Sequence, residues 1–189
     1  MPVLPQARHA HLLAGMCGLA VMTWAGAGHA LSEPTASDDV TDLKFGFYCD
    51  QDSQVERAAP DTITGTISVP ETVPQFFALG QTGPAMLGLG FGVTAKITER
   101  LEGTATIRVE HPPQGEAGVT VESWQTDFSV EGLNFAGFSF DYDYELTPGL
   151  WRFSASRDGR PIYDVEFEIL PEALSPLPSF PCPGPTPMS

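Results

Sequence analysis

The sequence predicts an all-β fold, a sandwich or barrel of about eight short strands. Apolar residues alternate with polar residues or glycine in many short segments, which is the period of a strand with one buried face. Residues typical of turns separate these segments, and no segment shows the 3.6-residue period of an amphipathic helix. The 189 residues are 42% hydrophobic, which fits one globular domain.

The first thirty residues show the pattern of a secretory signal peptide. Arg8 precedes an apolar run over 12–25, and the small residues Gly28 and Ala30 indicate cleavage after Ala30. The apolar run is shorter than the ~20 residues that span a bilayer, which favours a signal peptide over a membrane anchor. We therefore expect the protein to be periplasmic or secreted, with no membrane span after cleavage.

The rest of the chain divides into three parts. Residues 31–40 are acidic and without pattern, so we expect a flexible arm. Residues 41–170 hold the strand segments and form the predicted β-sandwich domain. Residues 171–189 are a proline-rich tail, which we expect to be extended because proline suits neither a helix interior nor an inner strand.

Each strand segment is predicted from its alternation. The approximate ranges are 43–48, 62–69, 87–97, 105–109, 119–130, 138–146, 151–156 and 163–169. The turn signals Pro148-Gly149 and Asp158-Gly159 join the last three segments. These three predict an antiparallel meander with one face buried and the other facing solvent.

Within 87–93 every second residue is glycine, so one face of the predicted strand is bare. A bare face lets another group approach the backbone closely. A phosphate-binding loop is disfavoured, because the spacing lacks Gly-x-Gly-x-x-Gly and no Lys-Ser or Lys-Thr follows.

Two cysteines remain after signal cleavage, Cys49 and Cys182. In an exported chain such a pair is most simply a disulfide. The alternatives are two free thiols or a metal pair, and a two-cysteine zinc site would need further ligands from a chain almost without histidine.

The charge balance excludes two classes of partner. The chain has 24 acidic and 9 basic residues and a net charge of −15. Binding to nucleic acid or to anionic lipid needs clustered lysine and arginine, so we expect neither.

No catalytic residue and no cofactor is predicted. His111 is the one histidine that remains after signal cleavage, and it precedes two prolines in an expected loop. A nucleophile–base pair would need a serine and a carboxylate to converge there. We interpret His111 as a loop residue that makes a local hydrogen bond.

The clearest acidic set is Asp141, Asp143 and Glu145, which the alternation places on one strand face. Such a set is a weak candidate for calcium, and more distantly for a glycosidase carboxylate pair. We favour a solvated face partly neutralised by Arg152, Arg157 and Arg160, because a strand holds side chains on a flat lattice whereas calcium ligands surround the ion. No metal site is therefore predicted.

Several motifs carry a family resemblance. They are Gly46–Tyr48, Leu89–Val93, His111-Pro112, the run Tyr144–Phe153, and Asp158–Arg160 with the strand that follows to Ile169. Over about residues 41–170 the chain resembles DUF3859, a bacterial domain family without an assigned activity. The resemblance implies an exported, immunoglobulin-like antiparallel β-sandwich of about seven to nine strands, without substantial helix outside the signal peptide. It transfers no catalytic residue.

The sequence thus predicts a non-catalytic, exported binding or structural module, which we expect to be a monomer. Its ligand is unknown, and a partner protein or an envelope polymer would suit it. Tyr48, Phe76 and Phe77 are the candidates for exposed rings that bind carbohydrate. One alternative is a carboxylate-dependent enzyme that acts on glycans, with or without calcium. Another is a periplasmic chaperone or assembly accessory, which predicts a long unpaired edge strand beside an apolar groove.

Overall fold

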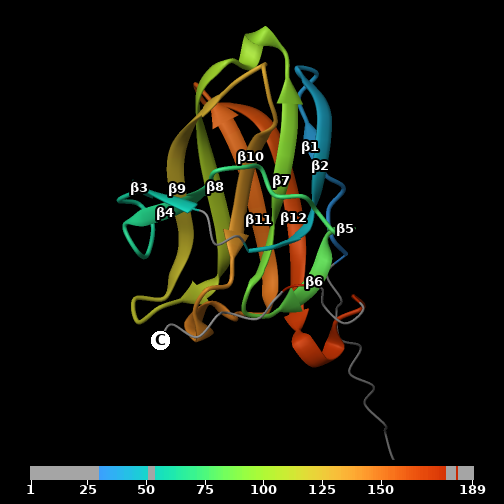
Figure 1. Cartoon of the computed structure of the whole chain (residues 1–189), viewed down its shortest axis with the longest axis vertical. Coiled ribbons are helices and arrows are strands. Elements are labelled where there is room, and N and C mark those ends of the chain that lie inside the picture. The colour runs from blue at the N-terminus through green and yellow to red at the C-terminus, as the bar shows by residue number, and fades with distance from the viewer. Residues whose placement is uncertain (1–29, 51–53, 178–181, 183–189) are drawn as a thin grey trace, which may run out of the picture.

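The structure is a computed structural model that describes residues 30–50, 54–177 and 182. Two β-sheets pack face to face, and a separate two-stranded ribbon lies beside them (Figure 1). The predicted all-β sandwich is confirmed. In the described part of the chain the helical elements are three single turns, and none is long or apolar enough to cross a bilayer. The predicted signal peptide lies, apart from Ala30, outside the described residues.

The larger sheet has the order β1-β12-β11-β8-β9, and β6 pairs in parallel with β12. Its strands are β1 (Thr35–Ala36), β6 (Thr82–Ala85), β8 (Gly103–Gln114), β9 (Val119–Phe128), β11 (Gly149–Arg157) and β12 (Arg160–Pro171).

The second sheet has the order β10-β7-β2-β5 and is antiparallel throughout. Its strands are β2 (Val40–Cys49), β5 (Ala78–Leu79), β7 (Leu89–Ile97) and β10 (Asn134–Ser139). The ribbon consists of β3 (Gln54–Ala58) and β4 (Thr66–Pro70). The three 3₁₀ turns are η1 (Glu99–Leu101), η2 (Asp143–Glu145) and η3 (Glu172–Leu174).

The core lies between the two large sheets and is rich in aromatic rings. Phe91 of β7 is fully buried, and its ring centroid lies 5.2 Å from that of Trp151, 5.6 Å from that of Phe153 and 5.3 Å from that of Phe167. The three partners come from β11 and β12 of the opposite sheet. Burial of each such side chain contributes roughly 1.5–3 kcal/mol, and the edge-to-face contacts add to this.

The glycine face of β7 is closely covered, as predicted. Gly90 lies in register between Tyr48 of β2 and Ser139 of β10. A Cβ atom on Gly90 would collide with the ring of Tyr48, so only glycine lets this ring lie across the strand. The Tyr48 hydroxyl reaches the Ser139 hydroxyl at 3.1 Å.

Eight of the twelve described strands overlap the predicted segments. The other four are β1, β3, β5 and β6, which are short and lack a clear apolar alternation. The region 50–61, expected to be turn-like, contains β3, whose residues are mostly exposed on both faces. A strand without a buried face leaves no alternation in the sequence.

The expected flexible arm is wrong in part. Thr35 and Ala36 form β1 and pair with Asp164 and Tyr163 of β12. The edge of β12 offers unpaired backbone groups, and β1 satisfies some of them. At the other end of the domain, β12 ends at Pro171 and η3 follows, so the tail begins with a turn rather than an extended chain.

The predicted meander is wrong in its first half, whereas its second half, the antiparallel hairpin of β11 and β12, is confirmed. The segment expected over 138–146 leaves the strand after Ser139, and β10 pairs with β7 in the opposite sheet. The neighbours of β11 are β12 and β8. Arg152 of β11 therefore lies 2.6 Å from Asp164 and 3.9 Å from Glu110, and not beside the acidic set at 141–145.

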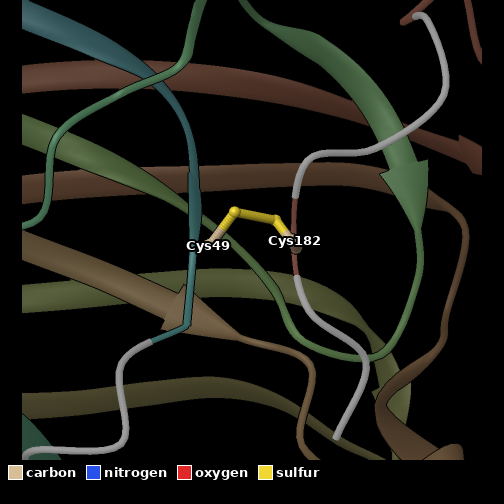
Figure 2. Close-up of a disulfide and its surroundings, with 2 residues drawn as sticks. All are labelled: Cys49 and Cys182. Carbon is tan, nitrogen blue, oxygen red and sulfur yellow. A yellow bond between two sulfur atoms is a disulfide. The ribbon is translucent and has the colours of Figure 1, made fainter.

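The predicted disulfide between Cys49 and Cys182 is confirmed, with Cα atoms 5.1 Å apart (Figure 2). Cys49 ends β2, and Cys182 packs against the core from the C-terminal segment. The bond joins residues that are 133 positions apart, so it closes almost the whole domain into one loop.

Replacing both cysteines (Cys49→Ser with Cys182→Ser) should lower the free energy of unfolding by about 2–5 kcal/mol, because the unfolded chain regains the entropy of a long open loop. Urea unfolding of the oxidised protein and of the double variant measures the difference. Reduction of the native protein should reproduce it, and equal midpoints for all three samples would contradict the prediction.

Candidate functional site

A cleft of about 390 Å³ lies where the sandwich is open at one side. β9 and β10 are end strands of their sheets and do not pair with each other. Residues of β8 and β9 form one wall, β10 forms the other, the β3–β4 ribbon covers the cleft, and residues 141–145 border one end. In Figure 1 the ribbon projects beside β9, away from the packed centre of the sandwich.

The ribbon and its loop are attached to β9 by backbone groups. The carboxylate of Glu122 accepts a hydrogen bond from the backbone N–H of Ile63 at 2.7 Å. The N–H of Ser123 donates to the carbonyl of Asp61, and the Arg57 guanidinium donates to the carbonyl of Gln125. These bonds hold the ribbon and its loop, which cover the cleft, against the outer edge of β9.

His111 lies within β8 and is buried, so its placement in a loop is wrong. Its ring stacks on Trp151 with centroids 4.9 Å apart. Nδ1 donates to the carbonyl of Pro112 at 2.8 Å, which is the local hydrogen bond expected, and Nε2 lies 3.4 Å from the carboxylate of Glu122. Among the described residues, the polar groups in contact with the His111 ring are the carbonyl of Pro112 and the carboxylate of Glu122, and neither is a nucleophile.

The acidic set Asp141, Asp143 and Glu145 does not share a strand face. Asp141 and Asp143 are exposed, whereas Glu145 is buried. The Glu145 carboxylate accepts the backbone N–H groups of Asp141 at 2.7 Å and of Tyr142 at 2.9 Å. This local bonding folds the chain into η2 and ends the alternation. In the described residues no group of three or more potential ligands is placed to hold a metal ion.

Two of these carboxyl groups have raised pKa values. Asp141 is an exposed residue, but nearby protein atoms partly desolvate its carboxyl group, and this desolvation, followed by the charges of Asp50 and Glu145, raises its pKa to about 7. Burial is also the main reason that the pKa of Glu145 is raised, although the two backbone hydrogen bonds act in the opposite direction. A positive charge near these groups would relieve the repulsion between them.

The turn also changes the role of two tyrosines. The strand expected over 138–146 would bury Tyr142 and Tyr144, but they are 55% and 41% exposed. Their rings stack with centroids 5.5 Å apart and an interplanar angle of 11°, and both residues line the cleft. Tyr48, expected to be exposed, is instead buried, whereas Phe77 is 40% exposed.

Gln114 at the end of β8 lines the cleft and is 2% exposed. Its Nε2 donates to the carbonyl of Glu145 at 2.9 Å and to the hydroxyl of Thr147 at 3.0 Å. Its Oε1 is buried and accepts no hydrogen bond from the described part of the protein. Sequence reasoning missed Gln114, Tyr142 and Tyr144, because their roles depend on where β8 and β10 end.

Glu145→Ala should lower the free energy of unfolding by about 2–4 kcal/mol, because two backbone N–H groups lose a charged acceptor. Asp143→Ala is the matched control, since it removes an exposed carboxylate from the same turn, and its effect should stay within about 0.5 kcal/mol. Urea unfolding at neutral pH measures both. Equal losses in the two variants would contradict the prediction.

Asp141 should make the protein less stable as the pH rises. Its pKa in the folded state is about 7, above its ordinary value, so between about pH 4 and pH 7 the folded state holds a proton that the unfolded state has released. The free energy of unfolding therefore falls as the pH rises through this window. Asp141→Asn should remove the contribution that the Asp141 carboxyl makes to this decrease.

Melting temperatures of the native protein, Asp141→Asn and the control Asp143→Asn between pH 4 and pH 8 test this. The melting temperature of Asp141→Asn, relative to that of the native protein, should rise as the pH rises. If the melting temperatures of all three proteins changed with pH in parallel, the raised pKa assigned to Asp141 would be contradicted.

Comparison with known proteins gives the family. The solved structure of an immunoglobulin-like protein from Pseudomonas aeruginosa is similar, with a TM-score of 0.49 and 14% identity over 75% of this chain and 100% of that chain. No protein of curated function matches the chain significantly. The sequence profile described as "Domain of unknown function (DUF3859)" matches residues 36–169. The resemblance seen in the sequence is thus confirmed, and the chain belongs to the DUF3859 family.

Proposed function

We propose that this protein is a non-catalytic binding module, exported to the bacterial periplasm or secreted, whose ligand site is the cleft under the β3–β4 ribbon. The observation that carries the proposal is the cleft itself, bordered by two exposed tyrosines and a cluster of carboxylates. Exposed aromatic rings beside a concave polar surface are typical of ligand sites. The lining groups of the cleft come from both sheets and from the ribbon.

Two further observations support export and binding without catalysis. The Cys49–Cys182 disulfide fits an oxidising compartment, in agreement with the signal-peptide pattern. His111, the main candidate base, is buried between Trp151 and Glu122, and the cleft lining does not include it.

A carboxylate-dependent enzyme that acts on glycans is a second candidate. It is favoured by the pKa of Asp141, which is raised to about 7 as in the general acids of glycoside hydrolases. A chaperone is supported less well. β9 is a long end strand, but the groove beside it is lined largely by charged, hydroxyl and amide groups, such as Arg57, Asp61 and Asp127.

The binding proposal is tested by two-dimensional NMR of the purified protein with three probes. These are a blocked arginine peptide (acetyl-Gly-Arg-Gly-amide), the neutral glycan chitotetraose, and calcium chloride. We expect at least one organic probe to shift backbone resonances of cleft residues such as Gln114, with no shift in Tyr142→Ala/Tyr144→Ala. The same double variant should keep the native melting transition, because both rings are exposed.

Each contrary outcome identifies a different error. Shifts confined to residues outside the cleft, or no shift with any probe, would overturn the binding proposal. Release of shorter sugars from chitotetraose, lost in Asp141→Asn, would replace it with the glycan-acting enzyme.

A further inference from the structure

We infer that the cleft binds a basic side chain, the guanidinium or ammonium group of an arginine or lysine in a polypeptide partner. This inference rests on the proposed binding function and names the chemistry of the ligand. Three independent features of the cleft lead to it: its charge, an unpaired buried acceptor, and the stacked tyrosines at its mouth.

The lining carries an excess of negative charge. Among the described lining residues the one that is basic is Arg57, whose guanidinium donates to the carbonyl of Gln125 on β9. The acidic residues of the lining are Asp50, Glu56, Glu122, Asp141 and Glu145. A cation in the cleft would therefore find several carboxylates and little repulsion, and would lower the mutual repulsion of Asp141, Asp50 and Glu145.

The unpaired acceptor is Oε1 of Gln114. A buried acceptor without a partner costs roughly 1–3 kcal/mol, so it is a place where a ligand donor stabilises the complex. The amide orientation follows from its contacts, since Nε2 faces the carbonyl of Glu145 and must be the donor. The lining thus presents acceptors to a ligand, and this favours a ligand rich in N–H donors.

The stacked rings of Tyr142 and Tyr144 provide the third feature. Their faces carry negative partial charge and attract cations, most often arginine. Both rings are exposed and border the cleft beside Asp141, so a basic side chain can contact an aromatic ring and a carboxylate together.

An organic cation suits this arrangement better than a metal ion. The described residues contain no group of three or more carboxylate, histidine or cysteine ligands placed around one point. A guanidinium group spreads five N–H donors over a plane, so separated acceptors can each receive one. A second cleft, lined by residues of β3, β8 and β9, shares Arg57, Trp124 and Thr126 with the first, so an extended peptide has room there to carry the side chain.

The test compares two peptides that differ only in charge. Acetyl-Gly-Arg-Gly-amide and the same peptide with citrulline in place of arginine have nearly the same shape. Isothermal titration at pH 8 and low salt, above the pKa of Asp141, should give at least tenfold tighter binding of the arginine peptide. Added salt should weaken binding of this peptide but not of its citrulline analogue.

Variants of the protein locate the site. Asp141→Asn and Tyr142→Ala/Tyr144→Ala should each weaken binding of the arginine peptide about tenfold. Glu99→Gln removes the same charge from the exposed turn η1, outside the cleft, and should leave the affinity unchanged. Melting temperatures of all variants show whether a lost affinity reflects lost folding.

The outcomes separate this inference from the proposed function. Equal affinities for the two peptides, or binding that survives both cleft variants, would overturn the inference. Shifts caused by chitotetraose alone would also overturn it while leaving the binding function intact. Spermidine that binds more tightly than the arginine peptide would overturn the assignment to a polypeptide. Failure of every probe to reach the cleft would overturn both proposals.

Discussion

The architecture depends on the burial of aromatic rings between the two large sheets. Phe91 lies at the centre of this contact and packs against Trp151, Phe153 and Phe167 of the opposite sheet. Because these rings are fully buried, the relative position of the sheets is tightly constrained. The cleft follows from this position, since the packed sheets leave the end strands β9 and β10 facing an open side.

Two carboxylates then shape the open side. Glu122 receives a backbone N–H from the ribbon loop and faces His111 with its other oxygen. Glu145 receives two backbone N–H groups and ends the strand, which exposes Tyr142 and Tyr144. Both are partly or wholly removed from water, and each organises a wall of the cleft. The acidic character of the site therefore has a structural origin as well as a role in the proposed recognition of a cation.

Asp141, Asp143 and Glu145 show that a regular alternation of polar and apolar residues can occur where the chain forms a turn and not a strand. Alternation over 138–146 predicts a strand with these three groups on its solvent-facing side. The competing interaction is local, because a glutamate that reaches back to two N–H groups stabilises a turn instead of a ladder. Periodicity cannot reveal this choice, since polar and apolar residues alternate in either case. The same limit applies to His111, where prolines suggested a loop and β8 continues past them with an irregular register.

Local sequence pattern was enough to predict the buried faces of β2, β7, β11 and β12, the hairpin turn at Asp158-Gly159, and the pairing of Cys49 with Cys182. Side chains that alternate between core and solvent record these features directly. Packing of the whole domain was needed to establish that β10 pairs with β7 rather than β11, and that Gln114, Asp141 and the two exposed tyrosines line one cleft. Strand partners and cleft walls come from segments far apart in the chain. The pairing of such segments depends on packing across the whole domain, and a local period in the sequence does not encode that packing.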